Sequence, residues 1–332
     1  MKNGKGLDVY SIGEMLIDFI PGGEPDSYIR HAGGAPANFA AAAAKNGLDA
    51  AMCCSVGDDD FGRYLYKALS QLGVSAPNTV MCKNAVTTMS FVSLDEHGER
   101  SFTFARCPGA DMFLLENMVD DDEVLASRLV HAGSFSLSES PAREATLKAM
   151  RLAHEAGHLV SFDVNYRDTV WHGQRCECAR RVAEAAPYID ILKISDEEAD
   201  LVGGEENIPA FMKQYDISAV AETLGDKGSE CYFAGNVITT PSRHVEAVDT
   251  TGAGDAFFGA FMSSLLIEGV DAKEKLTPDA VSRAAKYGNI SASICVSGYG
   301  GISSIPTRDE ILSAMGETKN ETLGNQQHNQ RI

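Results

Sequence analysis

Asp255 closes a glycine-rich turn, DTTGAGD (residues 249–255), which leads into an almost wholly apolar stretch of helical length, AFFGAFMSSLLIEG. Aspartate is a favoured helix N-cap, so this residue could serve the helix alone. The backbone amides of residues 252–254 converge at the same helix start, where partial positive charge binds anions. A carboxylate beside an anion site suits a general base that takes the proton of an alcohol attacking phosphorus. The turn therefore points to phosphoryl transfer to an alcohol.

The two common nucleotide-binding signatures are absent from this turn. The pattern G-x-x-x-x-G-K-[ST] does not occur, and after Gly252 and Gly254 the next glycine is Gly259, too late for G-x-G-x-x-G. A nicotinamide-dependent dehydrogenase is therefore disfavoured, because its dinucleotide fingerprint is missing.

A second glycine-rich stretch, GGAPANFAAAAAKNG (residues 33–47), has the features of a complete helix. Pro36 suits the first helical turn, Lys45 the last turn, and Gly47 can end the helix. The alanine run predicts close packing against a neighbouring element. Asn38 falls one turn in, where its side chain can point back to the helix start. Taken alone, this stretch favours a well-capped core helix over a binding site.

Composition restricts the function classes. Of 332 residues, 44% are hydrophobic and 23% charged, as in a soluble globular protein, and the formal net charge is −19 without a basic patch. This disfavours a nucleic-acid partner, although arginines and amides can still hold an anionic substrate locally. The N-terminus lacks a signal-peptide core, and no apolar run reaches membrane-spanning length. The eight cysteines form no C-x-x-C pair. We expect reduced thiols, a cytoplasmic location and no membrane partner. The sequence does not fix the oligomeric state, and a homodimer is one possibility.

Apolar, β-branched runs alternate with helical patterns over most of the chain, which predicts an α/β fold with a mostly parallel sheet and helices on both faces. The predicted helices include residues 61–73 and 141–157, and the predicted strands are residues 9–13, 50–57, 129–134, 158–164, 188–195 and 217–225.

Two segments, residues 16–34 and 87–110, instead resemble hairpins, the second turning at the sequence EHG. We expect them to meet as a small antiparallel sheet, which could be a lid over a cleft or an ordinary edge extension. Residues 1–315 are expected to form a single domain, and the polar residues 316–332 a disordered tail.

The two glycine-rich stretches together resemble the two signature motifs of the ribokinase-like (PfkB) carbohydrate kinase family, and the resemblance covers about residues 8–313. Within the family, the segments GEMLIDFIP, RCPGADM, FDVNYRDTVW, KISDEEADL and TLGDKG are most similar to fructokinases. The resemblance implies a Rossmann-like αβα sandwich with a β lid, ATP as phosphoryl donor, and magnesium at the phosphates.

The resemblance also assigns residue roles. Asp255 would be the catalytic base, with Gly252, Ala253 and Gly254 as the anion hole. The sugar would contact Asp18, Gly34, Asn38, Arg106 from the lid, and Arg167, which could contact phosphate instead. The alternatives without a functional role are a solvated edge residue for Asp18 and surface charges for the two arginines. The nucleotide loop would comprise Thr223, Gly225, Lys227 and Gly228, with Asn289 near the adenine.

Metal sites are implied as well. Magnesium and phosphate would involve Glu198 and Ser195, where serine replaces the asparagine of the family's Asn-x-x-Glu motif. A monovalent-cation loop, expected to bind potassium, would comprise Asp249, Thr251, Cys295, Gly298, Gly300 and Ser304, several of them through backbone carbonyls.

The sequence is compatible with three functions. The leading interpretation is an ATP-dependent fructokinase that makes fructose 6-phosphate. The second is a kinase of the same family acting on aminoimidazole riboside or a ribose-type sugar, which shares the GGAPAN motif and the aspartate. The third is a non-catalytic sugar sensor, which the intact Asp255 and glycine turn disfavour.

Overall fold

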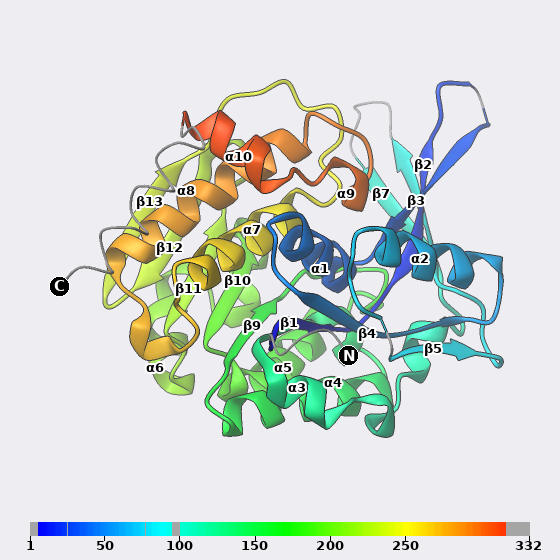
Figure 1. The fold of residues 1–332 in the computed structure, drawn as a ribbon, viewed down its shortest axis with the longest axis horizontal. Helices are drawn as coiled ribbons and strands as arrows, with labels where there is room; N and C mark the ends of the chain where they lie inside the picture. The colour runs from blue at the N-terminus through cyan, green and yellow to red at the C-terminus, as the bar shows by residue number, and fades with distance from the viewer. Residues whose placement is uncertain (1–5, 25, 77, 95–99, 317–332) are drawn as a thin grey trace.

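The computed structural model describes residues 6–24, 26–76, 78–94 and 100–316, and its strands form two separate sheets (Figure 1). The larger sheet has nine strands in the order β13-β12-β11-β10-β9-β8-β1-β4-β5. Their bounds are β1 (Leu7–Ile12), β4 (Ala50–Gly57), β5 (Thr79–Cys82), β8 (Ser127–Gly133), β9 (Leu159–Asp163), β10 (Ile191–Ser195), β11 (Ala219–Thr223), β12 (Gly228–Phe233) and β13 (Asn236–Pro241).

In this sheet the seven strands β5, β4, β1, β8, β9, β10 and β11 are parallel to one another. β12 pairs antiparallel with β11, and β13 pairs antiparallel with β12 at the edge. The prediction of a mostly parallel sheet is confirmed, and all six predicted strands are present. The sequence analysis did not identify β5, β12 or β13. β5 and β13 are the edge strands and are partly exposed, so they lack the continuous apolar run of the central strands. β12 lies next to β13 and is mostly buried, but its sequence GSECYF mixes polar and apolar residues.

Helices cover both faces of this sheet, as predicted, because the side chains of its strands alternate between two apolar clusters. Val9 of β1 belongs to one cluster and Tyr10 to the other. The first cluster is formed with α1 (Ala35–Lys45), α2 (Asp60–Gln71), α7 (Ala253–Ile267) and α8 (Pro278–Cys295). The second is formed with α3 (Asp121–Ala126), α4 (Ala142–Glu155), α5 (Arg175–Ala185) and α6 (Ile208–Tyr215).

Short helices complete the described chain. Two are α-helical, α9 (Gly301–Ser304) and α10 (Arg308–Met315). The 3-10 turns are η1 (Ala110–Phe113), η2 (Glu116–Met118), η3 (Ser134–Leu137), η4 (Ala186–Tyr188), η5 (Asp196–Val202), η6 (Glu205–Asn207), η7 (Gly225–Lys227) and η8 (Lys273–Lys275). The predicted tail, apart from Gly316, lies outside the described residues.

The smaller sheet is built from the two predicted hairpins, in the strand order β3-β2-β6-β7. Its strands are β2 (Leu16–Pro21), β3 (Tyr28–Gly33), β6 (Met89–Leu94) and β7 (Arg100–Ala105), and they project from the body of the molecule in Figure 1. Each hairpin is antiparallel, but β2 and β6 join them in parallel. The expectation of an antiparallel sheet was therefore wrong at the junction, because strand direction across two separate hairpins is not encoded in either one.

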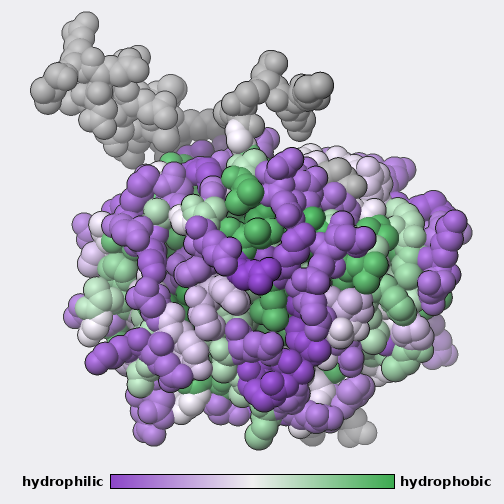
Figure 2. All heavy atoms as spheres, turned by 90° about the horizontal axis from the view of Figure 1, so that it is seen from below, coloured by the Kyte–Doolittle hydropathy of each residue, from purple (hydrophilic) through white to green (hydrophobic). Residues whose placement is uncertain are grey.

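Helices α1 and α7 pack closely, and this contact fixes where their N-termini lie. A Cβ atom at Gly259 of α7 would lie only 2.5 Å from Cβ of Ala42 in α1. The alanine run of α1 therefore allows the approach that the sequence predicted, and the two glycine-led helix starts come together. Within the part of the chain that the structure describes, no helix is both long and apolar enough to cross a membrane. The face shown in Figure 2 is mostly polar, with small separate apolar patches.

Candidate active site

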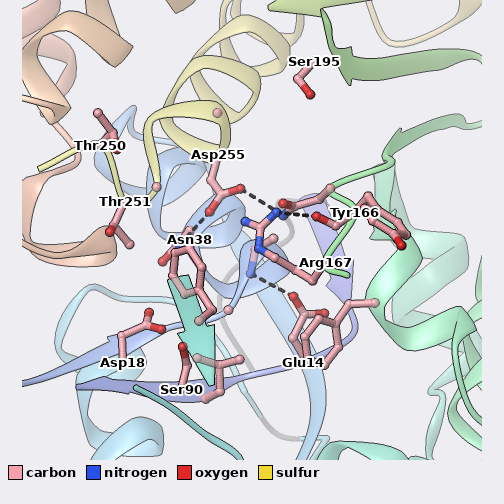
Figure 3. Close-up of a pocket in the computed structure, with 18 of the residues that line it drawn as sticks. Glu14, Asp18, Asn38, Ser90, Tyr166, Arg167, Ser195, Thr250, Thr251 and Asp255 are labelled. Carbon is pink, nitrogen blue, oxygen red and sulfur yellow. Dashed lines mark hydrogen bonds between the residues drawn. The ribbon is translucent and has the colours of Figure 1, made fainter. Parts of the chain in front are cut away.

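A cleft of about 470 Å³ lies between the two sheets, at the carboxyl ends of the central parallel strands. Such a position is where open α/β sheets bind ligands. The sequence-predicted residues that line it are Asp18, Gly34, Asn38, Arg167, Ser195, Glu198, Thr223, Thr251, Gly252, Gly254 and Asp255. Figure 3 shows Asp255, Asn38 and Arg167 facing the same space, with Asp18 and Ser90 on the strands of the smaller sheet below them.

Asp255 is buried in the first turn of α7 and is directed into the cleft. Its Oδ2 accepts a 2.6 Å hydrogen bond from Nδ2 of Asn38, and its Oδ1 lies 3.5 Å from Nδ2 of Asn165. The N-cap of the helix is Gly252, and no side chain caps this end by a hydrogen bond. The reading of Asp255 as a simple helix cap is therefore wrong. Burial raises the pKa of Asp255, while the hydrogen bond from Asn38 and the charge of Lys193 act against that rise.

The glycine turn before α7 leaves backbone amides facing the cleft. Gly252 has a positive φ of 78°, which favours glycine and turns the chain into the helix. The amide of Ala253 donates to the carbonyl of Thr250 at 3.2 Å, so it is engaged in the turn. No acceptor for the amides of Gly252 or Gly254 is found among the described residues. These two amides can therefore donate hydrogen bonds to an anion, as amides at helix N-termini do.

The sugar-facing side predicted from the sequence is largely brought together. Asp18 on β2 pairs in register with Ser90 on β6, and burial raises the pKa of Asp18 to about 7. Arg167 also lines the cleft, with its guanidinium 5.7 Å from the ring centre of Phe102. Phe102 and Phe104 of β7 form part of the wall. The sequence pattern did not show which face of β7 these rings occupy.

Arg106 is not brought to the cleft. Its side chain is buried just beyond β7, where Nε donates to Asp111 at 2.8 Å and Nη1 donates to Ser138 at 3.0 Å. The guanidinium also stacks 4.4 Å from the ring centre of Phe135. In this structure Asp111, five residues further on, gives Arg106 a buried partner instead of a place in the cleft lining.

The nucleotide residues predicted from the sequence are only partly in the cleft. Ser195 and Thr223 line it, whereas Gly225, Lys227 and Gly228 follow β11 just outside its lining. Asn289 is buried in α8 and donates to the carbonyl of Thr240 at 2.9 Å.

Glu198 is held rigidly at the end of η5's first turn. Its Oε1 accepts from the amide of Tyr166 at 2.6 Å, and its Oε2 accepts from the amide of Ser195 at 2.9 Å. Because each carboxylate oxygen has a second lone pair, Glu198 can still bind a hard cation or the water around one.

The residues of the predicted monovalent-cation loop lie together beneath the α7 turn. The buried carboxylate of Asp249 accepts from the amides of Thr251 at 2.8 Å and Gly300 at 2.9 Å. Sγ of Cys295 lies 3.1 Å from Oγ of Ser304. Gly298 is close enough to Ser304 that a Cβ atom there would lie 3.0 Å from its Cβ. These contacts join the loop to the start of α7.

Several residues that line the cleft were missed by the sequence reasoning, among them Glu14, Ser90, Asn165, Tyr166, Lys193 and Thr250. Lys193 and Asn165 stood within segments used for the family resemblance, KISDEEADL and FDVNYRDTVW. Asn165 follows the buried strand β9, and polar residues at the carboxyl ends of parallel strands are candidates for a site. Lys193 is the middle residue of β10, so this signal was available from the sequence for Asn165 only.

Comparisons with known proteins agree with this geometry. The pfkB family carbohydrate kinases match residues 7–308. Fructokinase-1 of Oryza sativa subsp. japonica is 35% identical over 322 residues, covering 94% of this chain and 98% of the relative.

Three solved structures share the ribokinase-like α/β fold. The fructokinase from Xylella fastidiosa with bound ATP has a TM-score of 0.85 at 28% identity, covering 93% of this chain and 98% of that one. The fructokinase from Vibrio cholerae O395, with fructose, ADP and calcium bound, has a TM-score of 0.83 at 30% identity, covering 92% and 98%. Aminoimidazole riboside kinase from Salmonella enterica has a TM-score of 0.81 at 27% identity, covering 92% and 99%. The chain belongs to the pfkB family of carbohydrate kinases.

Proposed function

We propose that this carbohydrate kinase transfers the γ-phosphoryl group of ATP to D-fructose and forms fructose 6-phosphate. The observation that carries the proposal is the placement of Asp255: a buried carboxylate held by Asn38, which does not cap its helix and faces a cleft with two unengaged amides. The similarity to fructokinases over nearly the whole chain supports fructose as the acceptor.

Asp255 acts as the general base in this proposal. The acceptor hydroxyl oxygen forms a bond to the γ-phosphorus, the bond from that phosphorus to the ADP oxygen breaks, and the hydroxyl proton moves to Asp255. Asn38 occupies Oδ2 at 2.6 Å, whereas Oδ1 has only the 3.5 Å contact with Asn165, so Oδ1 is the oxygen that would take the acceptor proton. The amides of Gly252 and Gly254 stabilise the charge on the transferring group, with Ala253 completing the turn.

The sugar is held at the end of the cleft formed by the smaller sheet, which we propose to act as the lid of a single kinase domain over residues 1–315. Asp18, Asn38 and the Gly34 backbone contribute the polar contacts, and Arg167 approaches from the main domain. A buried site that hydrogen-bonds hydroxyls rejects analogues that lack them, because its own polar groups are then left unpaired.

The donor set fits the cofactors that we propose. Glu198 and Ser195 offer oxygen ligands for magnesium at the phosphates, and the residues from Thr223 to Gly228 follow them toward the nucleotide. Magnesium, when bound to the phosphates, would offset their negative charge. Asp249 and the backbone around Thr251, Cys295, Gly298, Gly300 and Ser304 would hold potassium beneath the α7 turn, where it would order the amides without touching the substrate.

One observation favours a second acceptor, aminoimidazole riboside. Phe102 and Phe104 are stacked, with ring centres 6.4 Å apart, and both line the cleft. Two aromatic rings give the apolar wall that the base of a nucleoside needs. A ribose-type sugar without a base would gain nothing from it.

A kinase assay with ATP and magnesium on fructose, ribose and aminoimidazole riboside tests the acceptor. We expect fructose to give the highest kcat/KM. The variant Asp18→Ala should raise the KM for fructose by roughly 10- to 100-fold, because hydrogen bonds to a charged or buried polar group are lost, with the KM for ATP nearly unchanged. A panel in which the riboside wins would overturn fructose and leave the kinase chemistry standing.

A further inference from the structure

Lys193 places a buried ammonium group next to the α7 turn. The residue lies on β10, in register with Asp163 on the neighbouring strand β9. Its Nζ donates to both carboxylate oxygens of Asp163, at 2.9 and 3.1 Å, and both side chains are almost fully buried. An ammonium group has three donors. No acceptor for the third donor is found among the residues that the structure describes.

The third donor has one open direction, which is the cleft. Lys193 lines the cleft together with Gly254 and Asp255. A Cβ atom at position 254 would lie 3.0 Å from Nζ of Lys193, so glycine at this position keeps the ammonium beside the backbone of the turn. The charge therefore lies beside the Gly254 backbone, in the lining of the same cleft.

The surroundings keep this ammonium charged. Burial works against the charge, but the carboxylates of Asp163 and Glu198 hold the pKa of Lys193 above its ordinary value. An acidic cleft that must receive the polyanionic phosphates of a nucleotide needs a compensating positive charge from the protein as well as from a metal ion. Lys193 has the position and charge state for that purpose.

We propose that Lys193 is a catalytic residue whose ammonium contacts the phosphoryl group during its transfer, and that Asp163 positions it. The proposal rests on the phosphoryl transfer proposed above, but not on which sugar is the acceptor. Lys193 keeps its proton throughout: the acceptor oxygen bonds to phosphorus, the bond from phosphorus to the ADP oxygen breaks, and the acceptor proton goes to Asp255. The competing explanation is a structural ion pair that joins β9 to β10.

Two variants separate these explanations. Lys193→Met alone leaves the carboxylate of Asp163 buried without its cationic partner and should lower the melting temperature under either explanation. The double variant Lys193→Met with Asp163→Asn removes both charges, and the introduced asparagine can still accept from the amide of Asn165, as Asp163 does at 3.1 Å. The matched control is Lys148→Met, which breaks a lysine–aspartate pair of 2.7 Å with Asp121, away from the cleft.

We expect the double variant to regain most of the melting temperature but to keep a kcat about 100- to 1,000-fold below wild type, as when one donor to a transition-state charge is removed. Its dissociation constants for the sugar and ADP, measured by calorimetry, should stay within about threefold of wild type, because Lys193 contacts only the transferring group. Lys148→Met should keep the wild-type kcat. A double variant with near-normal kcat would make the pair structural and overturn the proposal.

A binding measurement gives a readout that does not depend on turnover. Aluminium fluoride, added with magnesium, ADP and sugar, imitates the phosphoryl group in transfer. Wild type should bind it and gain thermal stability, whereas the double variant should bind it at least about tenfold more weakly. Equal binding would also overturn the proposal. All measurements use the sugar that wild type phosphorylates fastest, so failure of fructose as acceptor would appear in the wild-type panel alone.

Discussion

Helices α1 and α7 start with nearly the same residues, yet they differ in whether their first backbone amides have acceptors. Each has a glycine N-cap with positive φ, Gly34 at 105° and Gly252 at 78°, followed by alanine, and neither is capped by a side chain. In α1 the next residue is Pro36, which has no amide hydrogen, and the amide of Ala35 donates to Oε1 of Glu14 at 3.0 Å. At these two positions the protein itself engages or removes the backbone donor.

In α7 the corresponding next residue is Gly254, whose amide has no acceptor among the described residues. The contrast shows that a glycine-led helix start is not an anion site by itself. The helix start becomes one when the chain leaves donors unengaged. Proline removes the donor at the third position of α1, whereas α7 keeps the amide of Gly254 at the same position.

The largest effect is expected from Asp255→Asn in α7. Asparagine keeps the size and can still contact Asn38, but it cannot accept the proton. We expect kcat to fall about 100- to 10,000-fold, the usual contribution of general-base catalysis. ADP binding measured by calorimetry should change little. Near-normal turnover in this variant would mean that Asp255 is no base and that the two helix starts differ less than we infer.

Gly254→Pro would give α7 the start that α1 has, since glycine, alanine and proline already occupy positions 34–36. The variant loses the amide donor, and we expect kcat to fall about 100- to 1,000-fold. Gly254→Ala is the control: it keeps the amide, and its methyl group would only press on Nζ of Lys193, 3.0 Å away.

For that control we expect a smaller fall in kcat, on the order of tenfold, and circular dichroism should show both variants folded. If the two variants lost activity equally, the Gly254 amide would not be the important donor.

A smaller effect is expected from the monovalent cation, because the proposed cation loop adjoins the turn before α7 only through backbone groups, such as the Thr251 amide that donates to Asp249. Gly252 packs against Gly301 so closely that a Cβ atom there would lie 3.0 Å from its Cα. Activity in potassium should exceed activity in tetramethylammonium at equal ionic strength by about fivefold or more, the range of ordinary coupling between sites. Equal rates in the two salts would remove the cation from the proposed site.

The sequence predicted the parts of this arrangement that depend on local pattern. The apolar runs gave the parallel strands and the two hairpins, and the glycine turns marked both helix starts. The family resemblance, rather than any local pattern, placed Asn38 and Asp255 in one site, while the hydrogen bond between them came from the structure. Pairings between side chains escaped the local analysis. Glu14 to Ala35 and Lys193 to Asp163 join distant segments, and Arg106 to Asp111 depends on how the chain turns after β7. A lone lysine or glutamate in a sequence gives no sign of its partner.

The smallest effect on activity, and the one that tests α1, is expected from Glu14→Gln. Burial raises the pKa of Glu14 to about 8, so the folded protein holds this proton up to that pH, whereas the unfolded chain releases it near 4.5. Between these values the folded state binds more protons, so stability falls as pH rises and then levels off above pH 8.

Glutamine is always neutral and can still accept from the Ala35 amide. We therefore expect the variant to lose less stability than wild type between pH 5 and 8.5, by about 1.4 kcal/mol for each unit of the removed pKa shift. Urea unfolding of both proteins across this range measures the difference. Other buried carboxyl groups, such as Asp18, act equally in both proteins and cancel. Parallel stability curves would show that Glu14 is ionised in the folded protein, so that α1, like α7, would hold a negative charge at its start.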